Sequence, residues 1–116
     1  MKSKELVKIA INALEDIKAH DIAVLEIDEM VALFDCIIVA SADSNRQTRA
    51  LANNVQVKVK AAGGTVLSIE GQETGEWLLV DLGDVVVHIM LPAVREYYDL
   101  ESLWAETKLL KKHAAD

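Results

Sequence analysis

The fold of this 116-residue chain is decided by the stretch EWLLVDLGDVVVHIMLPAVREYYDLESLW, residues 76–104. It contains two apolar runs, Trp77 to Val80 and Val85 to Leu91, joined by a short segment with Gly83. That pattern is typical of a β-hairpin, since glycine can take the positive φ that tight turns require. The second run is apolar on both of its faces and is ended by Pro92, so we expect a strand in the middle of a covered sheet.

Large amphipathic side chains are concentrated directly after this strand. Both tyrosines of the chain and one of its two tryptophans lie there, interleaved with carboxylates: Glu96, Tyr97, Tyr98, Asp99, Leu100, Glu101, Leu103 and Trp104. We interpret this segment as the working surface of the protein. The alternatives are that Leu100 and Leu103 anchor a terminal helix to the sheet and that Trp77 is ordinary core packing.

Length and composition predict one globular domain, residues 1–107, followed by a tail at 108–116. Hydrophobic residues make up 52% of the chain and charged residues 27%, which is usual for a globular protein. The single cysteine, Cys36, excludes an intramolecular disulfide and a multi-cysteine metal site. Neither a signal peptide nor a run of ~20 apolar residues is present, so a cytoplasmic location is expected.

The formal net charge of −7 bears on the kind of partner. An acidic chain with scattered basic residues is repelled by phosphate backbones, which disfavours nucleic acid as the main contact. The same charge favours a basic protein partner. The alternative is that the charge serves solubility alone.

The remaining pattern predicts three further strands and two further helices. Apolar residues from Leu6 to Ile17 recur at helical spacing after Ser3, a candidate N-cap. Ile22 to Ile27 and Cys36 to Ala40 read as antiparallel neighbouring strands, because no crossover separates them.

Ser44 and Gln47 predict the start of a second helix. They fit the capping box, in which each side chain binds a backbone donor of the first turn. Gly63-Gly64 ends that helix. Thr65 to Ile69 is then expected to run parallel to the strand ending at Ala40. The element order predicts an α/β or α+β domain with a mixed five-stranded sheet flanked by helices.

Several motifs now show a resemblance to a known family. They are Leu33-Phe34-Asp35-Cys36 running through Ser44-Asn45-Arg46-Gln47, Ala62-Gly63-Gly64, Glu70-Gly71, Trp77-x-x-x-Asp81-x-Gly83-Asp84, His88, and Arg95-x-x-Tyr98-x-Leu100-Glu101-x-Leu103-Trp104. In this order and spacing the chain resembles the ribosomal silencing factors, the Iojap-related proteins, from about Leu6 to Trp104. The resemblance implies a sheet with nucleotidyltransferase-like topology but without that chemistry.

The resemblance also implies a function and a site. Such a protein binds the large ribosomal subunit through ribosomal protein L-fourteen, blocks association of the two subunits, and represses translation when nutrients are scarce, as in stationary phase. The partner-facing residues it implies here are Trp77, Leu78, Tyr98, Leu100, Glu101 and Trp104, with His88 and Arg95 beside or beneath them. It leaves open whether the free protein is a homodimer.

The alternative is an enzyme of the nucleotidyl transferase kind. Glu26 and Asp28 have the alternate spacing of metal-binding carboxylates, but the Gly-Ser pair that such enzymes need is replaced by Asp43-Ser44. The three histidines, His20, His88 and His113, lack the spacing of metal ligands. We therefore expect neither catalysis, nor a metal, nor a cofactor.

Overall fold

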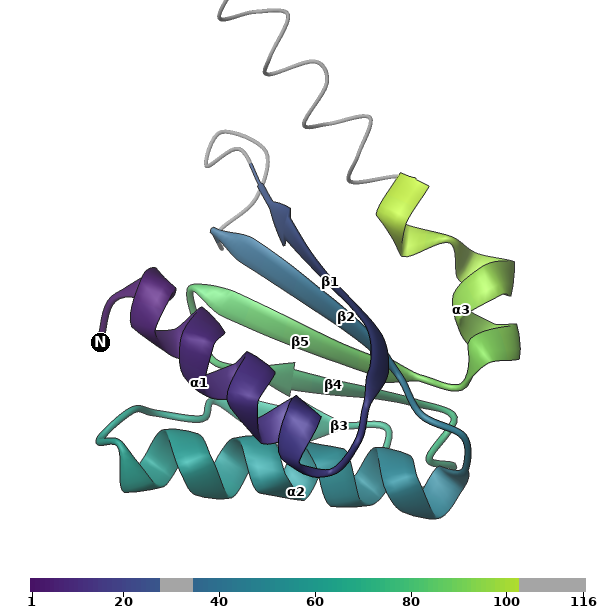
Figure 1. Cartoon of the computed structure of the whole chain (residues 1–116), viewed down its shortest axis with the longest axis horizontal. Coiled ribbons are helices and arrows are strands. Elements are labelled where there is room, and N and C mark those ends of the chain that lie inside the picture. The colour runs from purple at the N-terminus through teal and green to yellow at the C-terminus, as the bar shows by residue number, and fades with distance from the viewer. Residues whose placement is uncertain (28–34, 103–116) are drawn as a thin grey trace, which may run out of the picture.

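The computed structural model describes residues 1–27 and 35–102, which form three helices and a five-stranded sheet (Figure 1). In chain order the elements are α1 (Ser3–Asp16), β1 (His20–Glu26), β2 (Cys36–Ser41), α2 (Asn45–Ala61), β3 (Ser68–Glu70), β4 (Trp77–Asp81), β5 (Val85–Met90) and α3 (Pro92–Tyr98). The predicted fold class, a mixed five-stranded sheet flanked by helices, is confirmed. The predictions for Asp28, Leu103, Trp104 and the tail at 108–116 concern residues outside the described ranges.

The predicted hairpin is present, and it supplies the centre of the sheet. β4 and β5 pair antiparallel with Leu79 opposite His88, and Gly83 has φ +92° in the turn between them. Asp81 closes this turn, since its Oδ1 accepts a 2.8 Å hydrogen bond from the Gly83 amide. All six residues of β5 are buried. The strand order is β1-β2-β5-β4-β3, and β2 and β5 are the parallel pair.

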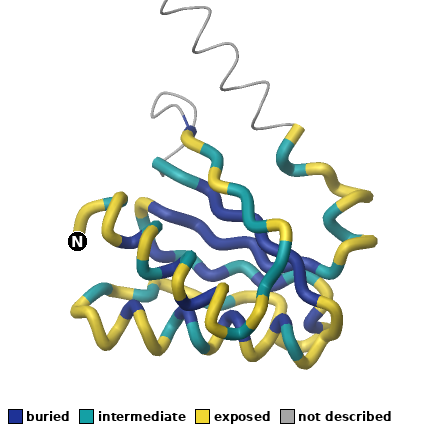
Figure 2. Tube along the Cα trace, viewed as in Figure 1, coloured by how far each residue is buried: buried dark blue, intermediate teal, exposed yellow. Residues whose placement is uncertain are grey.

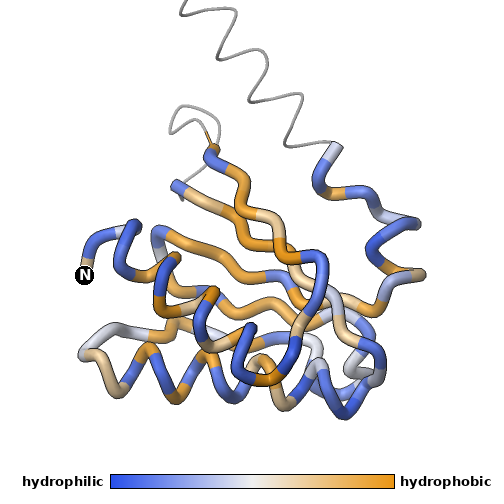
Figure 3. Tube along the Cα trace, in the orientation of Figure 1, coloured by the Kyte–Doolittle hydropathy of each residue, from blue (hydrophilic) through white to orange (hydrophobic). Residues whose placement is uncertain are grey.

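The two faces of the sheet are covered differently (Figures 2 and 3). α1 and α2 pack against one face, where Val85, Val87 and Ile89 of β5 join the main hydrophobic core. On the other face a smaller cluster contains Ile27, Ile37, Val39 and Met90, with Trp77, Val94 and Leu100 packed against it. α3 has no buried residue of its own. Among the described residues no helix has the length and apolar character needed to cross a bilayer.

The strand after α2 differs from its prediction in its bounds. It covers Ser68–Glu70 instead of residues 65–69, and it pairs with β4 at the far edge of the sheet. Its direction is parallel to β2, as expected, because two antiparallel pairings and one parallel pairing separate them. Ser68 and Glu70 are exposed, and a short polar strand suits an edge, whereas the fully apolar β5 requires the centre.

The helix starts show one wrong and one modified prediction. Ser3 is not the N-cap of α1: Lys2 holds that position, and the Ser3 hydroxyl instead donates to the Asp35 carboxylate. Ser44 does cap α2, since its Oγ accepts from the Gln47 amide at 3.1 Å. The reciprocal bond, however, comes from the Asp43 amide, which donates to Gln47 Oε1 at 2.8 Å.

Gln47 also links the two long helices. Its Nε2 donates to the carbonyl oxygens of Ile17 and Lys18, directly after α1. At the other end of α2, Gly63 has φ +88° and the Gly64 amide donates to the Val59 carbonyl, as the sequence predicts.

Removing the cap tests this helix start. We expect Ser44→Ala to lower the free energy of unfolding by about 1 kcal/mol. Gln47→Ala should lower it further, because its amide makes hydrogen bonds to three backbone groups. Urea unfolding gives both values. The matched control is Asn53→Ala, an exposed change in the same helix that should stay within about 0.5 kcal/mol, and a control as costly as Ser44→Ala would contradict the capping role.

Candidate functional site: an aromatic surface at the end of the sheet

Three aromatic side chains meet where β4 begins and α3 ends. The rings of Trp77 and Tyr98 lie 4.8 Å apart between centroids, and those of Tyr97 and Tyr98 lie 5.0 Å apart in an edge-to-face arrangement. Tyr97 is 82% exposed and Tyr98 is 54% exposed. We call Trp77, Tyr97 and Tyr98 the aromatic surface. Because Tyr98 contacts both of the other rings, this surface presents apolar area that is partly ordered before it meets a partner.

His88 holds the tryptophan from below. The indole Nε1–H of Trp77 donates a 2.9 Å hydrogen bond to His88 Nδ1. An indole N–H can only donate, so Nδ1 must accept, which requires the neutral imidazole with its proton on Nε2. His88 is only 8% exposed, and burial lowers the pKa of its ring to about 4. The geometry and the electrostatics therefore agree on an uncharged, structural histidine.

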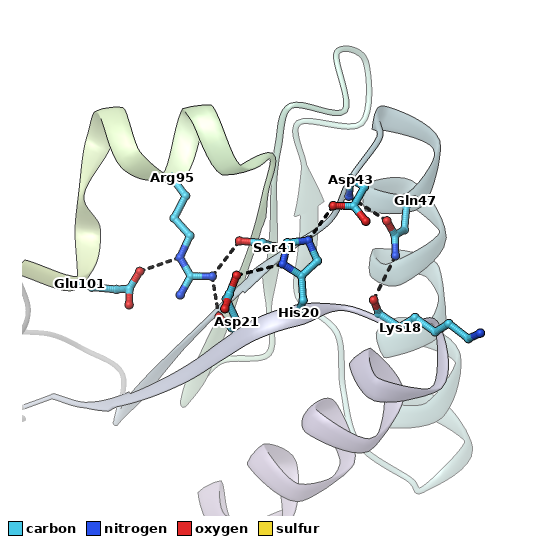
Figure 4. Close-up of polar contacts among 8 residues, drawn as sticks. All are labelled: Lys18, His20, Asp21, Ser41, Asp43, Gln47, Arg95 and Glu101. Carbon is cyan, nitrogen blue, oxygen red and sulfur yellow. Dashed lines mark hydrogen bonds and ion pairs between the residues drawn. The ribbon is translucent and has the colours of Figure 1, made fainter.

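Arg95 holds α3 against the sheet (Figure 4). Its Nη1 donates to the Asp21 carbonyl of β1 and to Ser41 Oγ of β2 at 2.8 Å, while its Nε donates to Glu101 Oε1 at 2.6 Å. The arginine side chain is only 14% exposed. Since α3 has no fully buried residue, these charge-assisted bonds and the half-buried Val94 and Leu100 determine where the helix lies.

An open polar cleft lies beside this arginine. Its volume is about 390 Å³, and its lining is mostly acidic: Asp21, Ser41, Pro92, Arg95, Glu96, Asp99 and Glu101. Asp21 and Asp99 both have positive φ, +51° and +46°. For residues other than glycine this conformation is uncommon. At Asp21 it accompanies an irregularity in the β1–β2 register and turns the carbonyl toward Arg95.

His20 connects this cleft to the start of α2. Its Nδ1 lies 3.0 Å from Asp21 Oδ2, and its Nε2 lies 2.8 Å from Asp43 Oδ1. The hydrogen bond to Asp21 and then that to Asp43 raise the pKa of the ring. The pairs are largely exposed, so they organise the loop ends more than they stabilise the fold.

The residues predicted from sequence are only partly brought together. Trp77, Tyr98, Leu100 and Glu101 lie on or beside the aromatic surface, with His88 and Arg95 beneath it. Leu78 does not: it is fully buried in the core beneath α1 and α2. The reason is the pleat, since neighbours in a strand point to opposite faces. Leu100 is half-buried and anchors the segment after α3, as the alternative interpretation had it.

Three residues of this region are absent from the predicted partner-facing set. The sequence placed Tyr97 in the aromatic, acidic segment after Pro92, but the resemblance did not assign it to the site. Asp21 and Ser41 carry no signal in the sequence, because they are 74 and 54 residues from Arg95 in the chain and meet it only in the folded sheet.

The fold and the site together define a small α+β domain that presents a preorganised aromatic surface beside an acidic cleft. The comparisons with known proteins give the family. The family model described as "Ribosomal silencing factor during starvation" matches residues 1–116. This chain belongs to the ribosomal silencing factor family, as the resemblance in its motifs indicated.

Three relatives illustrate the match. The chain is 58% identical over 108 residues to the ribosomal silencing factor of Chromobacterium violaceum, covering 93% of this chain and 88% of that protein. A crystal structure of a protein from Chromobacterium violaceum is similar with a TM-score of 0.87 at 59% identity, covering 90% and 88% of the two chains. The mouse protein named "Mitochondrial assembly of ribosomal large subunit protein 1" is 31% identical over 101 residues, which is 84% of this chain and 44% of its own length.

We expect acid to destabilise this protein through His88. The pKa of its imidazole is about 4 in the folded chain, against 6.5 for a free histidine. Between these values only the unfolded state takes up the proton. The stabilising contribution is therefore complete above pH 6.5 and is lost as the pH falls toward 4, with a slope of up to about 1.4 kcal/mol per pH unit. Urea unfolding across this range measures it.

His20 is the necessary control, because it acts in the opposite sense. Its pKa is raised, so its contribution is present below pH 6.5 and is lost as the pH rises through the raised value. The comparison is made in a His20→Gln background, with and without His88→Gln. Removing His88 should flatten the pH dependence, and identical slopes would contradict the assignment.

Proposed function

We propose that this protein binds the large ribosomal subunit through ribosomal protein L-fourteen, blocks association of the two subunits, and so represses translation when nutrients are scarce. Two comparisons support a ribosomal partner: the family model and the mouse relative named for assembly of the mitochondrial ribosomal large subunit. The proposal places the protein in the bacterial cytoplasm, with its partner.

The observation that carries the docking site is the exposed, prearranged aromatic surface. Tyrosine and tryptophan most often carry the binding energy of protein interfaces. Here Trp77 is held by His88 and the ring of Tyr98 packs against it, so docking freezes few rotatable bonds of these two side chains. On binding, the exposed ring of Tyr97 and the half-exposed ring of Tyr98 leave water while their hydroxyl groups remain able to find partners.

The acidic cleft supplies the electrostatic part of the proposal. Glu101 uses Oε1 for Arg95, and Oε2 of the same carboxylate can accept from a lysine or arginine of the partner. Asp21, Glu96 and Asp99 line the same cleft. Such complementarity with a basic ribosomal protein raises the association rate more than the affinity, and salt weakens it.

Alanine substitutions in the docking site test the proposal. Tyr98→Ala and Trp77→Ala should each weaken binding to large subunits at least tenfold, which is ~1.4 kcal/mol. We expect the same of Trp104→Ala, which the resemblance assigns to the site. All three variants should also lose the ability to prevent subunit joining on a sucrose gradient. The matched control is Leu67→Ala, an exposed apolar residue before the edge strand β3 that should behave as wild type.

One outcome would contradict this assignment of the docking site. Variants with native circular dichroism that still separate the subunits at wild-type concentrations would place the docking surface elsewhere. The same aromatic surface can also pack against a second copy of the chain. If it does, sedimentation of the free protein should show a dimer that Tyr98→Ala converts to a monomer.

The enzyme alternative has its own test. The relative from Chromobacterium violaceum is named as a ribosomal silencing factor, a regulatory role. Glu26 ends β1 and is exposed, and Asp28 lies outside the described residues. We expect purified protein with magnesium and a nucleoside triphosphate to release no pyrophosphate above background. Release that disappears in a Glu26→Gln, Asp28→Asn variant would establish the alternative.

A further inference from the structure

Helix α2 is the exception in an acidic protein. It carries four basic residues, Arg46, Arg49, Lys58 and Lys60, and no acidic residue, although the whole chain has a net charge of −7. The basic residues look scattered along the sequence, but the fold places these four on a single element. Helix α2 therefore differs in charge from the acidic cleft beside α3.

Three of the four cations form a stripe along α2 with two amides. Arg46, Arg49, Asn53, Gln56 and Lys60 follow one another at intervals of three and four residues, which keeps them on one side of a helix. We call these five residues the α2 donor stripe. Gln56 is half-buried and the other four are exposed, whereas Thr48, Leu51, Ala52, Val55 and Val59 face the core. Figure 2 shows the outward side of α2 largely exposed along its length.

Helix stability explains only one end of this arrangement: Lys58 and Lys60 lie in the last turn of α2, where the helix dipole favours cations. The positive end of the helix dipole lies at the N-terminus, where Asp or Glu would be favourable and cations are not. The first turns of α2 nevertheless hold two arginines and no carboxylate. The helix dipole therefore does not account for the two arginines at this end of α2.

Arg49 is held in an extended position by its neighbours. Its Nε donates to the Gln72 carbonyl at 2.7 Å and its Nη2 to the Glu73 carbonyl at 2.8 Å. Carbonyl oxygens are neutral acceptors, so they fix the guanidinium without cancelling its charge. Within residues 1–27 and 35–102, no ion pair joins Arg46, Arg49 or Lys60 to a carboxylate.

We propose that the α2 donor stripe binds the phosphate backbone of RNA on the ribosome to which the aromatic surface attaches the protein. The inference rests on the proposed function for its setting. All five side chains offer N–H donors, which suit phosphate and sugar oxygens. From Arg46 to Lys60 the stripe extends about 21 Å, at 1.5 Å per residue, so it can contact several phosphates of one strand. The stripe itself contains none of the aromatic anchors that mark a protein interface.

The net charge of the chain sets the strength of this contact. Repulsion between the acidic body and RNA keeps binding to free RNA weak at physiological salt. On the ribosome, docking through the aromatic surface holds the stripe at a high effective concentration, so a weak contact adds to the overall affinity. The stripe therefore acts as a second attachment point.

Charge reversal tests the inference. The double variant Arg46→Glu, Lys60→Glu should bind large subunits at least tenfold more weakly at low salt. In a plot of log affinity against log salt concentration, the slope for this variant should be shallower by roughly 1.5, because two phosphate contacts are lost. The matched control is Lys4→Glu, Lys8→Glu, which changes the net charge equally on exposed positions of α1. The control should keep most of the affinity and the full salt slope.

Two further measurements separate this inference from the proposed function. Affinity for isolated ribosomal protein L-fourteen should be unchanged in the α2 variant, provided that circular dichroism shows a native fold. A fluorescent duplex RNA oligonucleotide at low salt should bind the wild-type protein and the α1 variant (Lys4→Glu, Lys8→Glu) but not the α2 variant (Arg46→Glu, Lys60→Glu).

Equal binding of all three proteins to subunits and to the oligonucleotide would overturn the inference. If the α2 variant loses subunit binding but still binds the oligonucleotide, the inference is also overturned, because the stripe would then contact an acidic protein of the ribosome instead of RNA. If the wild-type protein binds neither isolated L-fourteen nor large subunits, the proposed function itself is overturned.

Discussion

The pairing of β5 with β2 on one side and β4 on the other is the constraint on which the rest of this structure depends. β5 has six buried residues and contributes to the hydrophobic cluster on each face of the sheet. Its antiparallel register with β4 places Trp77 opposite Met90 and Leu79 opposite His88. Because side chains alternate between faces, Trp77 and His88 emerge on the same face, close enough for the indole to donate to the imidazole.

The strand also determines where the next element begins. Pro92 ends the ladder and starts α3 at its first helical position, with the fixed φ that suits a helix start. The helix is short and has no fully buried residue, so it has little stability of its own. Arg95 compensates by reaching across the ends of β1 and β2 to Asp21 and Ser41. The result is an exposed aromatic pair on a small helix whose position depends on polar contacts with distant parts of the sheet.

Two opposite surfaces follow from this arrangement. The face that α1 and α2 cover is separated from solvent by two helices, and the basic residues of α2 lie on the outer side of that layer. The other face carries the aromatic surface, with the acidic cleft at its edge. A partner rich in both RNA and basic protein could use both. Charge is thus sorted by the fold although it is mixed along the chain.

Local chemistry determined a large part of this protein from sequence alone. The hairpin, the burial of β5, the glycine turns at Gly63 and Gly83, and the cap of α2 all follow from short stretches, because the interactions that form them lie within a few residues. The family motifs are likewise readable in one dimension. Two features were not predicted from these local patterns. β3 lies at the edge because the more apolar strands occupy the centre of the sheet, and Leu78 is buried because the pleat points it to the face opposite Trp77.

Only the tertiary structure determined the contacts of Arg95, the cleft, and the helix face that gathers the cations. Asp21, Ser41 and Arg95 are too far apart in the chain for any spacing rule to connect them. The positive φ of Asp21, which turns its carbonyl toward Arg95, is also not predictable from the sequence, because residues other than glycine rarely adopt it. Apolar periodicity specifies which side chains are buried, but it does not specify which polar groups the folded sheet brings together.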